Sequence, residues 1–255
     1  MTPSGHDAVV RRSFEAQVGL FSGDDPPFAR RAPSPLAWVE PLDPEMIVLD
    51  VATGAAHVPE QLAPHVREVI GVDLTRALLD EGARRLRERG ITNVLLQEGN
   101  ASDLPFLEAS FDLAVSRSAL HHFENPEKPI MEMARVCRPG GRVVVVDLVA
   151  PNSDLRDAFD QFQRHLDPSH VRAFLEPELA DLLASTVGPL TYGASPDPFV
   201  LPIDSILTDV SDREAVMRAL RSELDGGPLT GLEPVEHADG ILVSFRITIV
   251  HAVRE

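Results

Sequence analysis

Two acidic residues, Asp50 and Asp73, stand in short apolar runs and are well suited to hold a polar ligand. Asp50 lies in the run at residues 47–51 and precedes the small residues 52–56, and Asp73 ends the run at residues 69–73. In open α/β sheets, an apolar strand, a turn of small residues, a helix and a second strand ending in an acid form a nucleoside pocket at the carboxyl ends of the strands. This pattern therefore predicts a nucleoside cofactor.

The small-residue turn distinguishes between the cofactors that such a sheet can bind. A P-loop ends in Gly-Lys-Ser/Thr, which this chain lacks, and a dinucleotide turn needs glycines so that the backbone can touch a pyrophosphate. Here Gly54 stands between Ala52 and Ala56. The Tyr-x-x-x-Lys of one large nicotinamide-dependent group is also absent, because Pro196 takes the place of the lysine relative to Tyr192, the sole tyrosine. S-adenosylmethionine has no phosphate, so a turn with one glycine suits it better.

Asp73 is the predicted ligand of the cofactor ribose. It follows the turn by about 20 residues, the spacing at which a dinucleotide fold places its ribose acid. A carboxylate at this point can accept hydrogen bonds from both ribose hydroxyls. The alternative is that Asp73 caps the helix predicted to start near Thr75.

Further short motifs follow the two acids in a specific order and spacing. Together they resemble the class I S-adenosylmethionine-dependent methyltransferases, most closely the branch that contains the ubiquinone and menaquinone biosynthesis methyltransferases. The resemblance runs from about Val48 to Asp147 and continues more weakly to about Arg172. The matching pieces are Leu49-Asp50-Val51-Ala52-Thr53-Gly54, Gly71-Val72-Asp73, Gly99-Asn100-Ala101-Ser102-Asp103-Leu104-Pro105-Phe106, Phe111-Asp112, Ala119-Leu120-His121-His122-Phe123 and Arg138-Pro139-Gly140-Gly141-Arg142.

The resemblance implies S-adenosyl-L-methionine as the cofactor and a role for each matching position. The backbone of residues 52–55 would contact the methionine end, which Arg117 would also line. Asp73 would hold the ribose, and Leu74 would lie against the adenine. The family usually carries a glycine at position 52 or 56, and we expect binding to tolerate the methyl groups of the alanines found here. The predicted cofactor-binding residues are Asp50, Ala52, Thr53, Gly54, Ala55, Asp73, Leu74, Asn100, Ala101 and Arg117.

Histidines near the predicted transfer site are candidate general bases. Methyl transfer needs a base only where the acceptor must lose a proton, as a phenol, an alcohol or a carbon acid would. His121 and His122 follow the predicted fourth strand, and His170 lies in a segment similar to one in relatives of this branch. His121 and His170 are therefore the predicted catalytic residues, the alternative for each being a structural role in packing. No metal site is predicted.

Alternating strands and helices must position these residues. The pattern predicts a Rossmann-like, doubly wound α/β fold with a mostly parallel sheet and an antiparallel C-terminal strand. The expected strands are residues 47–51, 69–72, 93–97, 111–116, 142–148 and 241–253.

The chain is predicted to form a single domain with four parts. They are a helical arm or flap at residues 1–40, with Phe21 or Phe28 contacting ligand, a cofactor-binding core at 41–150, a helical lid inserted after the fifth strand at 151–188, and a part at 189–255 that completes the sheet.

Composition narrows the possible partners. The 255 residues carry a net charge of -17, which repels nucleic-acid phosphates and anionic lipid. Lys128 is the only lysine and Cys137 the only cysteine, so no intrachain disulfide or cysteine-based metal cluster is expected. The sequence shows no secretory signal and no run long enough to cross a membrane, so a cytoplasmic protein is expected.

These observations lead to two hypotheses. The first is methyl transfer from S-adenosylmethionine to a small-molecule acceptor, either quinone-like or a secondary metabolite, through O, C or N. The second is a protein of the same fold that binds the cofactor without transferring the methyl group. A nicotinamide-dependent oxidoreductase is the third and least supported possibility.

Overall fold

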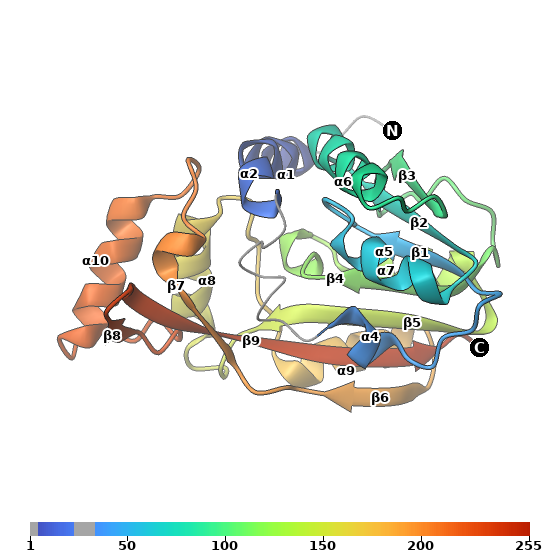
Figure 1. The fold of residues 1–255 in the computed structure, drawn as a ribbon. Coiled ribbons are helices and arrows are strands. Elements are labelled where there is room, and N and C mark those ends of the chain that lie inside the picture. Colours follow the sequence, from blue (N-terminus) through green and yellow to red (C-terminus); the bar gives the residue numbers. More distant parts are fainter. Residues whose placement is uncertain (1–4, 23–33) are drawn as a thin grey trace.

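The computed structural model describes residues 5–22 and 34–255, which are built around one large sheet (Figure 1). Within these residues the sheet has nine strands in the order β3-β2-β1-β4-β5-β9-β6, and β7 and β8 pair with β9. The five neighbouring strands β3, β2, β1, β4 and β5 are parallel to one another, and β9 runs antiparallel to β5. This order confirms the predicted fold class. The strands are β1 Ile47–Val51, β2 Glu68–Asp73, β3 Val94–Glu98, β4 Phe111–Arg117, β5 Cys137–Val149, β6 Leu190–Ala194, β7 Phe199–Pro202, β8 Val235–His237 and β9 Gly240–Val253.

Helices cover both faces of the sheet. Those that the structure describes are α1 Gly5–Ala16, α2 Val18–Phe21, α4 Pro35–Val39, α5 His57–Leu62, α6 Arg76–Glu88, α7 Glu127–Val136, α8 Arg156–Leu166, α9 Glu176–Thr186 and α10 Arg213–Leu224, with 3₁₀ turns η1 Ala63–His65, η2 Leu120–His122 and η3 Ile203–Ser205.

The centre of the sheet is buried on both faces, as the valine run in β5 predicts. Val143 and Val145 pack with α7 and α9, and Val144 and Val146 pack with α4 and α5 on the other face. All four side chains are essentially inaccessible to water. Continuous burial of this kind is typical of a parallel strand covered by helices on both sides.

Strand β9 is long enough to serve two regions of the molecule. One half pairs with β5 and β6, and the other half pairs with β7 and β8. Around this second half, α8, α10 and η3 form a separate apolar cluster, at the left end of the sheet in Figure 1. Within the segment 151–188, α8 belongs to this cluster, whereas α9 packs beneath the core beside α7.

The N-terminal segment forms two helices, α1 and α2. The break lies at Gln17, whose buried side chain bonds to Ser13 and Asp167 instead of continuing a surface helix. Helices α1 and α2 lie beside α6 (Figure 1).

Candidate functional site

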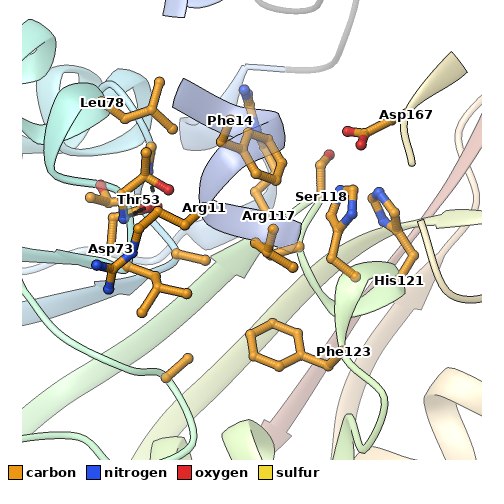
Figure 2. Close-up of a pocket in the computed structure, with 18 of the residues that line it drawn as sticks. Arg11, Phe14, Thr53, Asp73, Leu78, Arg117, Ser118, His121, Phe123 and Asp167 are labelled. Carbon is orange, nitrogen blue, oxygen red and sulfur yellow. Dashed lines mark hydrogen bonds between the residues drawn. The ribbon is translucent and has the colours of Figure 1, made fainter. Parts of the chain in front are cut away.

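One cavity of about 900 Å³ opens at the carboxyl ends of the parallel strands. Its wall contains every residue predicted for the cofactor and both predicted catalytic histidines. Figure 2 shows Asp73 on one side of the cavity, His121 on the other and Arg117 between them. The structure therefore brings residues from four separate sequence motifs to one site.

The turn after β1 has an unusual backbone. Ala52, Gly54 and Ala56 all have positive φ angles, of 58°, 56° and 59°. This left-handed region favours glycine because a Cβ atom is crowded there. The two alanines therefore occupy conformations that glycine adopts more easily. Alanine in place of the family's glycine thus adds backbone strain as well as the volume of a methyl group.

Two side chains hold this turn in place. Thr53 donates from Oγ1 to Oδ2 of Asp50 at 2.5 Å, and the Gly54 amide donates to Oδ2 of Asp73 at 2.8 Å. Gly82 was not among the predicted site residues, but it lets α6 approach the turn. A Cβ atom at position 82 would lie 3.0 Å from the carbonyl carbon of Ala55. A glycine inside a predicted amphipathic helix could have indicated this close packing, because glycine is unfavourable there without a packing reason.

Asp73 lies at the end of β2, between the cavity and the start of α6, whose N-cap is Thr75. Oδ1 of Asp73 accepts a hydrogen bond from the Thr75 amide at 2.8 Å, just before α6, while the side chain also lines the cavity. Burial raises the pKa of Asp73, although the hydrogen bonds from Thr75 and Gly54 oppose the shift. Because the carboxylate lines the cavity, a ligand hydroxyl can reach it and share these acceptor oxygens.

A partly buried cation lies at the end of β4. Arg117 lines the cavity and makes no hydrogen bond or ion pair with any residue that the structure describes. Burial lowers the pKa of Arg117, partly offset by the charge of Asp50, and burial raises the pKa of Asp50 to about 7. An unpaired guanidinium facing a cavity is suited to bind a carboxylate.

The opposite end of the cavity contains two histidine–aspartate pairs. His121 Nδ1 lies 2.5 Å from Oδ1 of Asp147, and His170 Nε2 lies 2.7 Å from Oδ1 of Asp160. The two rings are 5.5 Å apart, centroid to centroid. The His121 side chain is 10% exposed and the His170 side chain 2%, so His121 is the more accessible of the two.

Helices α1 and α2 close one side of the cavity. Phe14 and Phe21 line it, and Phe28, the other aromatic residue proposed to contact ligand, lies outside the described residues. Ser13 and Gln17 donate to the two oxygens of Asp167 at 2.7 and 2.9 Å.

Asp167 also organises the loop beneath these helices. It accepts a hydrogen bond from Ser169, whose hydroxyl lies 3.0 Å from Nδ1 of His122. Burial favours the neutral form of Asp167, but the hydrogen bonds from Ser169, Gln17 and Ser13 favour its charged form and lower its pKa. Burial lowers the pKa of His122 to about 3.

An apolar wall completes the cavity. Its residues were not among those predicted for the site. Its side chains come from the end of β5, from α8, from the β7–η3 region and from β9. They are Leu148, Leu166, Phe199, Ile206, Phe245 and Ile247. The alternation in β9 predicted a strand, but which face meets the cavity depends on its pairing with β7.

The described residues offer neither a metal site nor a membrane-spanning helix. They contain no group of three or more histidine, cysteine, aspartate or glutamate side chains placed to hold a metal ion. In the same part of the chain, no helix is both long and apolar enough to cross a membrane.

Comparison with known proteins places the site in context. Residues 49–145 match a family described as a methyltransferase domain. The chain is 30% identical to the demethylmenaquinone methyltransferase of Porphyromonas gingivalis over 194 residues, which are 74% of this chain and 76% of that protein. It is 41% identical over 126 residues to the uncharacterised methyltransferase YcgJ of Bacillus subtilis, and this match spans about half of each protein, 49% and 50%.

The fold comparison extends further along the chain. The crystal structure of YcgJ superimposes with a TM-score of 0.70 at 27% identity, covering 84% of this chain and 94% of that one. The similarity therefore includes the sheet and much of what surrounds it, beyond the segment of highest sequence identity.

Proposed function

Because this chain belongs to the S-adenosylmethionine-dependent methyltransferases, we propose that it transfers the methyl group of S-adenosyl-L-methionine to a small, largely apolar acceptor. The observation that carries the proposal is the single cavity that joins Asp73 and Arg117 at one end to His121 and the apolar wall at the other.

The residues at the Asp73 end fit the chemical groups of the cofactor. The Asp73 carboxylate lines the cavity and is an acceptor for the ribose hydroxyls, and Arg117 offers an unpaired guanidinium to the methionine carboxylate. The turn from Ala52 to Ala55 would lie along the methionine chain. Leu74, Asn100 and Ala101 would surround the adenine. When bound, the cofactor supplies a methyl group on a positively charged sulfur.

Asp50 has a supporting role in this proposal. Its carboxylate is 1% exposed and bonds to Thr53, so it holds the turn beneath the cofactor and faces Arg117. The protein then has to align the acceptor with the methyl group and exclude water. Helices α1 and α2 supply the cover that excludes water.

The apolar wall indicates the kind of acceptor. Aliphatic and aromatic side chains dominate this end of the cavity, so a ring or short hydrocarbon body would be bound there with few polar contacts. The name of the Porphyromonas gingivalis relative supports a quinone-like acceptor as one example of this class.

Calorimetry with S-adenosylhomocysteine tests the cofactor site. The wild-type protein is expected to bind at micromolar concentration, and Asp73→Ala is expected to lose at least about 100-fold in affinity, since it removes charge-assisted hydrogen bonds. Asp80→Ala is the matched control, because Asp80 is an exposed aspartate on α6 paired only with Arg76. Absence of binding by the wild type contradicts the proposal.

A methyl-labelling assay tests transfer itself. Methyl-labelled cofactor is incubated with candidate acceptors, and label in a product supports the proposal. Binding of the cofactor without transfer to any acceptor would favour the second hypothesis, a cofactor-binding protein that does not transfer the methyl group. Tight binding of NADH would instead support an oxidoreductase.

A further inference from the structure

Asp147 makes a set of hydrogen bonds that fixes the protonation of His121. Its Oδ2 accepts from the backbone amides of Leu120 at 2.6 Å and Ala119 at 3.2 Å, and its Oδ1 accepts from the Leu148 amide at 2.6 Å. His121 Nδ1 is the fourth partner, at 2.5 Å. Three backbone donors already surround the carboxylate, so it acts as the acceptor and Nδ1 carries the proton.

The same arrangement leaves the other ring nitrogen free to act as a base. With the proton on Nδ1, Nε2 of neutral His121 has a lone pair, and Nε2 bonds to no residue that the structure describes. His121 lines the cavity at the end opposite Asp73. A histidine oriented by a buried carboxylate and facing a ligand cavity is the arrangement of a general base.

The neighbouring histidines are arranged differently. His122 directs Nδ1 to Ser169, and His170 directs Nε2 to Asp160, which also accepts from the Ala173 amide. Burial lowers the pKa of both His122 and His170. Their rings lie 4.1 and 5.5 Å from that of His121, centroid to centroid, and form the wall against which it packs.

We propose that His121 is the general base of the transfer, that Asp147 is its positioning residue, and that the acceptor is therefore an O–H or C–H acid on an apolar body. This inference rests on the proposed methyl transfer and narrows its substrate class. An amine that reacts through its own free lone pair would not require such a base.

The proposed transfer moves one proton and one methyl group. The acceptor's proton passes to Nε2 of His121, and the electron pair left on oxygen or carbon forms the bond to the methyl carbon. The carbon–sulfur bond breaks with its electron pair on sulfur, which leaves neutral S-adenosylhomocysteine. Asp147 stabilises the positive charge on His121 until the proton leaves to water.

Nitrogen NMR of histidine-labelled protein bound to S-adenosylhomocysteine tests the protonation of His121 without an acceptor. The expected result is a protonated Nδ1 and an unprotonated Nε2 in the wild type, with the resonances assigned from their loss in His121→Asn. A proton on Nε2 of the neutral ring would overturn the proposal, because that nitrogen could not then accept one.

A series of phenols and naphthols of graded acidity tests catalysis. At about pH 8, His121→Ala is expected to slow transfer to weakly acidic phenols about 100-fold or more. Transfer to 4-nitrophenol, which is already ionised, should slow less than about tenfold, because it needs no base. Added imidazole should restore transfer to weakly acidic phenols. An equal loss with all acceptors indicates a structural role and contradicts the proposal.

Three controls complete the test. His165→Ala removes a histidine that lies 3.7 Å from Asp212 outside the cavity wall, and it should leave all rates unchanged. His121→Asn keeps more of the side-chain volume and replaces His121→Ala if that variant folds poorly. Binding of S-adenosylhomocysteine, measured by calorimetry, shows that each variant is folded. Transfer to amines or thiols, but to no hydroxyl compound and no carbon acid, overturns the inference. Transfer to an amine would still leave the proposed methyl transfer standing.

Discussion

At the scale of single residues, the backbone conformation of the turn after β1 determines what its alanines cost in stability. The sequence comparison treats Ala52 and Ala56 as added methyl groups, whereas the structure shows that both are held at positive φ. Positive φ costs an L-residue about 1–2 kcal/mol. The turn therefore stores strain next to the cofactor site, and nearby hydrogen bonds from Thr53 and Gly54 keep it in place.

This strain gives a testable prediction for Ala52→Gly. Glycine removes about 1–2 kcal/mol of strain and costs about 0.5–1 kcal/mol in chain entropy, so the free energy of unfolding should rise by up to about 1.5 kcal/mol. Urea unfolding followed by the fluorescence of Trp38, the only tryptophan, measures it. Ala55→Gly is the control: Ala55 is buried without positive φ, so this change should destabilise. Equal destabilisation by both changes contradicts the argument.

Asp50 makes stability depend on pH in a direction that can be stated in advance. Burial raises its pKa from 3.8 to about 7, so between these values the folded protein binds a proton that the unfolded chain has lost. Stability from this group is therefore greatest at low pH and falls as pH rises toward 7. Asp50→Asn removes the dependence and should stabilise the protein at about pH 8 by a few kcal/mol, and much less at about pH 4. Thermal unfolding of both proteins across this range measures the difference, and a gap that does not change with pH contradicts the prediction.

At the scale of secondary structure, several polar contacts attach α1 and α2 to the site, in addition to the packing of Phe14 against His122 and of Leu20 against the cluster around α8. Ser13 and Gln17 reach Asp167, His6 Nε2 lies 2.8 Å from the backbone oxygen of His122, and His57 Nε2 lies 3.0 Å from that of Phe21. Such contacts can be exchanged for water at lower cost than an apolar interface. These helices are therefore suited to open for ligand exchange.

The contact of α1 with Asp167 predicts the rate of cofactor release. A hydrogen bond to a charged group contributes about 1.5–3 kcal/mol, so Gln17→Ala should speed the dissociation of S-adenosylhomocysteine about tenfold or more. Stopped-flow displacement measures this rate. Glu15→Ala changes an exposed position at the end of α1, two residues before Gln17, and should have no effect. An unchanged rate in Gln17→Ala would show that α1 does not control release.

The elements also show what could be predicted from the sequence. Strands β1, β2 and β4 were predicted to within one residue because each is a buried run set by its own composition, whereas β5 begins at Cys137, five residues before the predicted start. Strands β6 and β7 and the α1–α2 break were not, because Gln17 and the segment 190–202 take their structure from distant partners, Asp167 and β9. The site divides in the same way: contiguous motifs predicted the cofactor end, whereas the apolar wall is assembled from separate elements.

At the scale of the whole molecule, a net charge of -17 acts against compactness. Raising ionic strength from about 0.01 to about 0.15 M shortens the screening length from about 30 to about 8 Å. The midpoint of thermal unfolding should therefore rise, by roughly 2–4 °C for about 1 kcal/mol of relieved repulsion. Calorimetry at about pH 8 measures this rise. Near the isoelectric point of about 4.9 the same salt should have little effect, and an equal rise at both pH values contradicts the explanation.

The long strand β9 has a consequence for the order in which the chain folds. β5 can align with β4 early, but its other edge stays open until β9 arrives, after the whole segment from α8 to β8. Joining strands so far apart in the chain is slow, because a large loop must close before any pairing is gained. During that interval the valine-rich edge of β5 is free to pair with another chain. The docking of β9 is thus the expected slow step of folding, and a chain caught before it is the form most prone to aggregate.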